Sequence, residues 1–277
     1  RYTLITKVVG AGQNISFDYD RKKQESSSVE TSRNFANKLW NASRFVMMNL
    51  KGKTPQELGQ PDIASLELVD KWLLSRFYQT VKQTKANIES YSLGEAAKGL
   101  YEFIWNDFCD WYIELVKTRL WQDETSKSRQ VAQQTLGYVL EGILKLLHPF
   151  MPHITEEIWH ELAERTEKDC IVVAEWPKPS TIDTNLIKNA EQIFEVISGV
   201  RNIRKENNIP NKESIALKIL ASSNYDKSFD ASIMHLGNIS EVEFITEKLT
   251  GFVGVHKGFS PPSAKPETKA EESVNYE

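Results

Sequence analysis

Apolar residues recur with a period close to 3.6 from Val29 to about Arg165, and this pattern predicts a run of amphipathic helices. Loop-forming residues interrupt the period at 52–61, 90–92 and 122–126, which divides the region into four long helices and a short final one. Amphipathic helices joined by short connections pack as an antiparallel bundle. We therefore expect a mainly α fold whose first compact part is a helical bundle over residues 29–165.

Each predicted helix carries one apolar face. In the first, which includes Arg33–Asn49, a rotation of 100° per residue gathers Phe35, Ala36, Leu39, Ala42, Val46, Met47 and Leu50 on one arc. The next three faces are Leu66, Val69, Leu73 and Phe77; Leu93, Ala97, Leu100, Ile104, Phe108, Trp111 and Leu115; and Leu136, Val139, Leu140, Ile143 and Leu147. Pro149 and Pro152 end the fourth helix, and the short one covers about Ile154 to Ala163.

The pattern changes after residue 166. A β-branched run at Ile171–Ala174 precedes a predicted helix from about Leu186 to Asn207. Ser214–Leu220 alternates apolar and polar residues like a strand, and Val242–Ile245 has the composition of another. We expect a small α/β module over 166–257, followed by a disordered tail over 258–277 that is rich in proline and charge.

The opposite arc of the first helix is unusual. It carries Arg33, Asn34, Asn37, Lys38, Asn41, Arg44 and Phe45. Solvated helix faces commonly mix Glu with Lys, but no carboxylate occurs between Arg33 and Lys53. From Arg21 to Lys53 there are eight Lys or Arg residues and two Glu residues, in a chain with a net charge of −4.

This composition is typical of RNA contact. Cations bind phosphates, amides read base edges, and an exposed phenylalanine offers a plane for base stacking. The alternative is a basic helix face that is only solvated. A second basic cluster, Arg201, Arg204 and Lys205, is predicted to face one direction near the end of its helix. It is either a second contact to RNA or an exposed helix end whose cations complement the helix dipole.

Four segments carry a family resemblance. RNFANKLWNASRF from Arg33, DKWLLSRF from Asp70, FCDWYIELVK from Phe108 and LLHPFMPHITEEIW from Leu146 resemble consecutive helices in the anticodon-binding domain of class I aminoacyl-tRNA synthetases. The first is most similar to the valyl family, as is VRNIRKENNIP from Val200. These motifs occur in the family's order over about 180 residues.

The resemblance implies that residues 1–28 are the end of a catalytic half and a connector into the bundle. The turn Gly10–Asn14 departs from the family's Pro-Gly-Gln-Asp pattern at Ala11 and Asn14, which weakens any detailed role for it. The long coiled coil that usually follows in the valyl family is missing. The ATP motif and the Lys-Met-Ser-Lys-Ser loop of the class are also missing, so we expect no catalytic residue in this chain. ATP with Mg is implied only for an intact enzyme.

The bulk properties agree with a soluble globular protein of 277 residues. No apolar run approaches the roughly 18–20 residues that span a bilayer, and the chain opens without an initiator Met or signal peptide, as expected of a piece of a longer protein. Two cysteines, Cys109 and Cys170, favour a reduced, cytoplasmic setting. They also cannot form a four-thiolate zinc site, which disfavours isoleucyl relatives that commonly carry one.

Other chemistry is weakly indicated. Asp107, Cys109, Asp110, His148 and His153 are spaced poorly for a shared metal, so we expect no metal site. The aromatic residues Trp105, Trp111, Tyr112 and Trp121 are interpreted as core or core-edge residues rather than a base-stacking platform.

We therefore predict a tRNA anticodon-binding region of a valyl-type enzyme, which positions the tRNA for aminoacylation by catalytic and editing domains outside these residues. Its expected partner is tRNA(Val), and no membrane is expected. Arg33, Lys38 and Arg44 are predicted phosphate or base contacts, Asn34, Asn37 and Asn41 base-edge contacts, and Phe45 the stacking residue. The alternatives are a helical module that binds protein instead of RNA, or the same region of an isoleucyl, leucyl or methionyl enzyme.

Overall fold

The computed structural model describes residues 2–8, 19–22, 24–220 and 229–245. The chain divides into two compact units, Arg1–Ile187 and Lys188–Glu277. This division falls later than the boundary expected at residue 165. The predicted turn at Gly10–Asn14 and the predicted tail at 258–277 lie outside the described residues.

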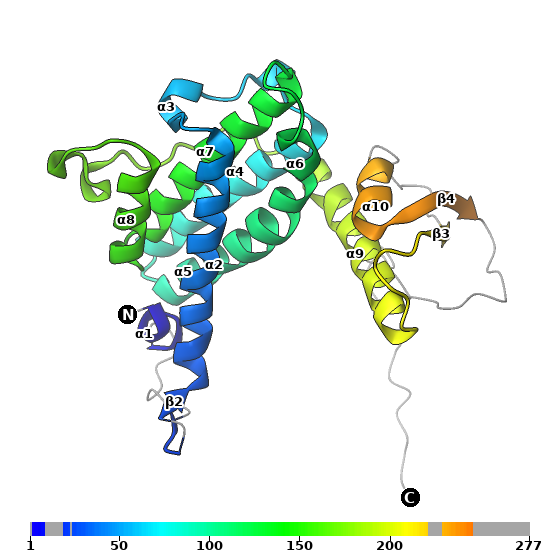
Figure 1. Cartoon of the computed structure of the whole chain (residues 1–277). Coiled ribbons are helices and arrows are strands. Elements are labelled where there is room, and N and C mark those ends of the chain that lie inside the picture. Colours follow the sequence, from blue (N-terminus) through cyan, green and yellow to red (C-terminus); the bar gives the residue numbers. More distant parts are fainter. Residues whose placement is uncertain (1, 9–18, 23, 221–228, 246–277) are drawn as a thin grey trace, which may run out of the picture. The chain divides into compact units, whose positions relative to one another are not determined.

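The first unit is a bundle of helices that lie side by side (Figure 1). Its principal helices are α2 (Ser27–Leu50), α4 (Leu68–Glu89), α5 (Leu93–Glu102), α6 (Ile113–Leu120), α7 (Lys127–Leu147) and α8 (Pro152–Leu162). Shorter elements are α1 (Tyr2–Val8), β1 (Tyr19–Asp20), β2 (Glu25–Ser26), α3 (Pro55–Leu58) and the 3₁₀ turn η1 (Ile63–Ser65). The helical bundle predicted from the apolar period is confirmed.

Helix α2 begins after Ser26 and ends where Lys51 takes a left-handed conformation with φ of 56°. Gly52 follows with φ of 78°, a region that glycine enters without steric cost. The apolar arc predicted for this helix is confirmed, because Phe35, Leu39 and Val46 are fully buried. α2 packs against α7 and α8 along this arc.

The third predicted helix is continuous from Leu93 to Leu120, but its middle is π-helical: η2 (Phe103–Tyr112) separates α5 from α6. The wider π-helical turn changes which residues face the core, and such segments often occur at functional sites. Phe103, Ile104 and Phe108 are buried within η2, while Trp105 and Asp110 lie partly exposed at its edge.

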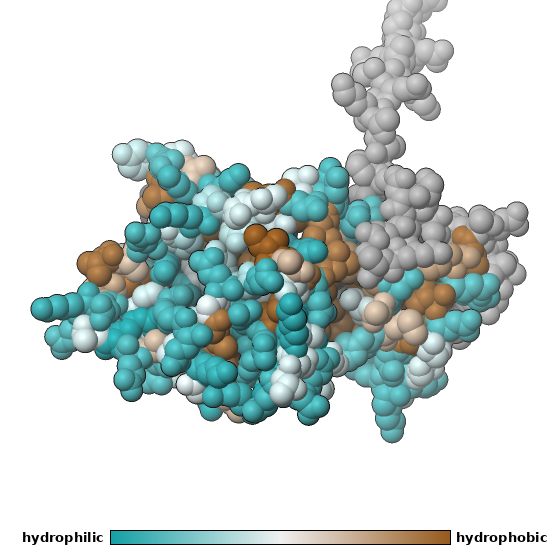
Figure 2. Space-filling model, turned by 90° about the horizontal axis from the view of Figure 1, so that it is seen from above, coloured by the Kyte–Doolittle hydropathy of each residue, from teal (hydrophilic) through white to brown (hydrophobic). Residues whose placement is uncertain are grey.

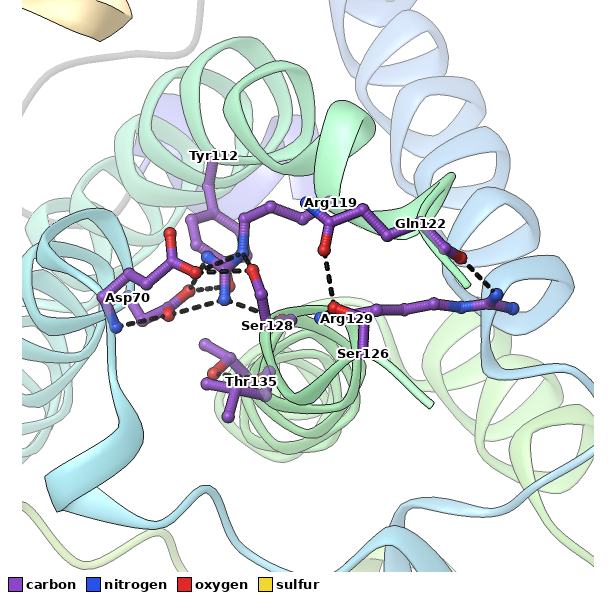
Figure 3. Close-up of polar contacts among 10 residues, drawn as sticks. Asp70, Tyr112, Arg119, Gln122, Ser126, Ser128, Arg129 and Thr135 are labelled. Carbon is purple, nitrogen blue, oxygen red and sulfur yellow. Dashed lines mark hydrogen bonds and ion pairs between the residues drawn. The ribbon is translucent and has the colours of Figure 1, made fainter. Parts of the chain in front are cut away.

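A buried polar network joins the ends of α4, α6 and α7 (Figure 3). Asp70 has no exposed surface and accepts hydrogen bonds from Arg119 Nη1 at 2.8 Å and Nη2 at 3.0 Å. The Tyr112 hydroxyl donates to the same carboxylate at 2.7 Å, and Arg119 Nε donates to Ser128 Oγ at 2.9 Å. Burial raises the pKa of Tyr112 well above its ordinary value, and the nearby Asp70 raises it further.

After α8, the chain forms two 3₁₀ turns, η3 (Glu167–Asp169) and η4 (Ile171–Val173). The β-branched run noted at Ile171–Ala174 thus forms a 3₁₀ turn. Ile171 is buried and its amide nitrogen bonds the Glu156 carboxylate at 3.2 Å, whereas Val172 and Val173 are exposed. One residue of the run is thus buried and hydrogen-bonded, and the next two are exposed to solvent, as in a turn and not in a paired strand.

In the second unit, α9 (Thr184–Glu206), which starts just before the division, leads to a parallel pair of strands, β3 (Ile215–Leu220) and β4 (Ile239–Ile245), with α10 (Asp230–Gly237) between them. The helix and both strands predicted for this region are confirmed. Lys218 Nζ pairs with Glu243 Oε2 across the strands at 2.6 Å. This unit is the small α/β module expected from the sequence.

Candidate nucleic-acid interface

The polar arc of α2 forms an exposed face. Arg33, Asn34, Asn37, Asn41 and Arg44 are all exposed, on the side opposite the buried apolar arc. Arg33 pairs with Glu30 at 3.4 Å, an exposed pair of the kind that contributes little stability. Among the described residues, the side chains of the other four have no hydrogen-bond partner. This face therefore offers amides and cations for binding.

Lys38 was expected on this exposed face, but its side chain contacts a second helix instead. Its ammonium group forms an ion pair with Asp110 of η2 and lies 4.3 Å from the centre of the Trp105 ring. Trp105 in turn stacks on Tyr101, with ring centres 5.4 Å apart. These contacts from a second helix hold the cation in the free protein, and its role as a phosphate or base contact stays a prediction.

Phe45 is half-buried rather than fully exposed. Lys117 of α6 lies beside it, with Nζ 6.0 Å from the ring centre, and the same nitrogen donates to Glu114 Oε1 at 2.6 Å. A cation–aromatic contact at this distance is at its outer limit. The part of the Phe45 ring that remains exposed is still available to a stacking partner.

The sequence did not predict that residues of η2 and α6 border this face. Asp110, Glu114 and Lys117 belong to the FCDWYIELVK segment, which the sequence did not connect with the polar arc of α2. The absence of carboxylates in the sequence from Arg33 to Lys53 is therefore not an absence in space, because Glu30 pairs with Arg33, Asp110 with Lys38, and Glu114 with Lys117 beside Phe45. The only signal in the sequence was that segment's mixture of charges and aromatic residues.

The second basic cluster is divided by the fold. Arg201 and Lys205 are exposed, but Arg204 is only 3% exposed. The Arg204 guanidinium donates to the carbonyl oxygens of Gly237 at 3.0 Å, Asn238 at 2.9 Å and Pro210 at 3.1 Å. The expectation that all three cations face one direction is wrong, because the buried Arg204 guanidinium uses four of its five N–H groups to bind backbone carbonyl oxygens of this unit.

Within the described residues, no group of three or more His, Cys, Asp or Glu side chains could hold a metal ion. Asp107 instead accepts a hydrogen bond from Arg76 Nε at 2.9 Å, and His148 Nδ1 lies 2.9 Å from Thr155 Oγ1. Burial raises the pKa of the Cys109 thiol to about 12, which leaves it a poor nucleophile and a poor metal ligand.

The interpretation of the aromatic residues holds for three of the four. Tyr112 is buried, and Trp105 and Trp111 are partly exposed at the edge of the core. Trp121 is 73% exposed at the end of α6, so its assignment to the core or its edge is wrong. The face shown in Figure 2 is mostly hydrophilic, with apolar residues gathered in separate patches.

Comparison with known families agrees with this architecture. The family described as the anticodon-binding domain of tRNA ligase matches residues 70–220, which is more than half of the chain. The chain therefore belongs to this family of anticodon-binding domains. Helix α2, which carries the exposed polar face, lies before the matched residues.

Similar curated proteins are valine–tRNA ligases. The chain is 51% identical over 248 residues to that of Thermosynechococcus vestitus, 51% over 266 residues to that of a Nostoc species, and 48% over 257 residues to that of a Synechocystis species. Each match covers 89% of this chain but 27%, 26% and 28% of the respective relative. The chain thus spans about a quarter of the length of these relatives. In the described part of the chain, no helix is long and apolar enough to cross a bilayer.

Proposed function

We propose that this chain binds the anticodon end of tRNA(Val) through the exposed face of α2, as one region of a valine–tRNA ligase. The observation that supports the proposal most strongly is the exposed polar face of α2. Three amides and two arginines are exposed on one side of a helix whose other side is fixed in the core. Membership of the anticodon-binding family and identity of about half to valine–tRNA ligases support the choice of RNA.

The roles follow from side-chain chemistry. Arg33 and Arg44 bind phosphates, and Asn34, Asn37 and Asn41 form hydrogen bonds with the edges of unpaired bases. Phe45 stacks on one of those bases, and its half-buried position holds the ring in one orientation. In the second unit, the exposed Arg201 and Lys205 are a second contact to the RNA backbone.

In the intact enzyme, catalytic and editing domains join this region, and ATP with Mg drives attachment of valine to the other end of the tRNA. The region described here supplies binding and position, so binding is the quantity to measure. The expected location of the enzyme is the cytoplasm.

The proposal is tested by titrating the full chain with tRNA that carries a valine anticodon, and with the same tRNA carrying a changed anticodon. Phe45→Ala should weaken binding by about 1–3 kcal/mol, the range for a lost base–aromatic stack. Asn41→Ala should reduce the preference between the two anticodons, because an amide contact to a base edge carries sequence information.

Thermal unfolding of each variant shows whether the fold is kept. If both tRNAs bind equally and neither variant changes binding, the face of α2 is only a solvated surface. Binding of a protein partner without tRNA would favour the alternative of a helical protein-interaction module.

A further inference from the structure

Two neighbouring lysines on the first unit differ in how tightly they are held. The seam between α2 and the continuous η2–α6 helix is defined by Lys38, Phe45, Asp110, Glu114 and Lys117. It brings residue 38 beside residue 110 of η2 and residue 45 beside residue 117 of α6. The two contacts are seven residues apart on each helix, which is about two helical turns. The seam thus places Lys38 beside the middle of the exposed polar face and Lys117 beside its Arg44 end.

Lys38 is held by contacts from another helix, namely the Asp110 carboxylate and the Trp105 ring. Lys117 is paired only with Glu114, three residues earlier on its own helix, and its side chain is 31% exposed. Ion pairs of this kind on a helix surface are weak and are screened by salt. The ammonium group of Lys117 can therefore exchange Glu114 for another anion at little cost.

We propose that Lys117 is a further RNA-binding residue, which binds the phosphate of the nucleotide whose base stacks on Phe45. The inference rests on the proposed function and adds to it a residue from α6 that no sequence pattern on α2 could indicate. A base and its phosphate are joined through a single sugar. A cation whose nitrogen lies 6.0 Å from the Phe45 ring centre is thus close enough to reach that phosphate.

In the free protein, Glu114 neutralises Lys117 and holds it beside Phe45. When RNA binds, the phosphate takes over as the anionic partner. Lys38 remains paired with Asp110 and keeps η2 in place against α2. In the seam, Lys117 thus exchanges its anionic partner when RNA binds, whereas Lys38 keeps its ion pair with Asp110.

The test compares Lys117→Met with Lys85→Met in the full chain, using tRNA with a valine anticodon at several salt concentrations. Lys85 is a matched control, because it also pairs with a glutamate on its own helix, Glu89, at 3.8 Å. Lys117→Met should weaken binding roughly three- to tenfold and reduce the slope of log affinity against log salt by about 0.7. Lys117→Arg should keep both quantities near the wild-type values, and Lys85→Met should change neither.

A double variant tests whether the two residues share one nucleotide. If they do, the combined loss in Phe45→Ala/Lys117→Met is smaller than the product of the two single losses. Losses that multiply fully, or a Lys117→Met effect no larger than that of Lys85→Met, overturn the inference. The inference alone also fails if Phe45→Ala weakens binding and Lys117→Met does not. Failure of the proposed function looks different, since then Phe45→Ala and Asn41→Ala leave binding unchanged as well.

Discussion

At the scale of single residues, the buried carboxylate of Asp70 is the most consequential polar group in the first unit. It accepts hydrogen bonds from Arg119 and Tyr112 and also from the backbone nitrogen of Glu67 at 2.9 Å, the start of α4. A buried charge is tolerated only when its partners are in place. The network therefore fixes where α4, α6 and α7 meet (Figure 3).

Asp70→Asn should lower the free energy of unfolding by about 3–5 kcal/mol, because the buried Arg119 guanidinium loses its buried charged partner and keeps only the more exposed Glu67 carboxylate, 3.3 Å from Nε. Denaturation in urea measures this change. Glu89→Gln is the control, since it removes a carboxylate from an exposed ion pair and should cost less than about 1 kcal/mol. Equal stability of the two variants would show that the network contributes little.

The two cysteines should differ sharply in reactivity. Burial raises the pKa of the Cys109 thiol to about 12, while Cys170 is partly exposed. At pH 8, a disulfide reagent should modify one thiol quickly and the second only after denaturation, because the thiolate is the reactive form. The stabilisation from a protonated Cys109 is present below the ordinary thiol pKa and is lost as the pH rises towards 12. Two equally fast reactions in the folded protein would contradict this.

The sequence predicted the burial or exposure of a residue correctly where this depends only on its position around one helix. The arcs of α2 follow from rotation about its axis, so the burial of Leu39 and the exposure of Asn41 were predictable. The pairing of Lys38 with Asp110 was not, because it joins residues far apart in the sequence. The burial of Arg204 was missed for the same reason, since two of its carbonyl partners, Gly237 and Asn238, lie 33 and 34 residues later in the chain.

At the scale of elements, α4 and α7 meet closely where Phe77 packs on Gly142. A Cβ added at Gly142 would lie 2.2 Å from Phe77 Cζ and 2.8 Å from Cε2, and Phe77 is itself buried. Glycine at this position lets the phenylalanine ring pack directly on the backbone of α7. The contact sets the separation of the two central helices.

Gly142→Ala should destabilise the protein by about 1–3 kcal/mol or more, because neither the ring nor the helix can move freely in a packed core. Gly99→Ala is a matched control on α5, where an added Cβ meets nothing within 4 Å. The control should be neutral or slightly stabilising, since alanine is the better helix former. Melting temperatures of the two variants measure the difference, and a stable Gly142→Ala protein would refute the close contact.

Element boundaries were largely predictable because proline, glycine and serine interrupt a regular apolar period. The π-helical stretch η2 was not, since its sequence keeps the same apolar spacing as the α-helices around it. The 3₁₀ turn at Ile171–Val173 was not predicted, because the preference of β-branched residues for strands depends on packing against a neighbouring strand.

At the scale of the whole molecule, charge is distributed unevenly. The chain has a net charge of −4, yet α2 presents Arg33 and Arg44 on a face with no carboxylate between Arg33 and the end of the helix. Binding of an anionic polymer must therefore depend on local charge and not on the total. The dependence of binding on salt reports how many phosphates that local charge neutralises.

The central claim is tested most directly by the salt dependence of tRNA binding in the double variant Arg33→Met/Arg44→Met. If each arginine binds one phosphate of a single-stranded loop, the slope of log affinity against log salt should fall by about 1.4. The control is Lys82→Met/Lys85→Met, which removes two exposed cations from α4. We expect weaker binding and a reduced slope of log affinity against log salt in the α2 variant, with wild-type values in the control. An unchanged slope in the α2 variant, or the same reduction in both, would show that the exposed face of α2 is not where the RNA binds.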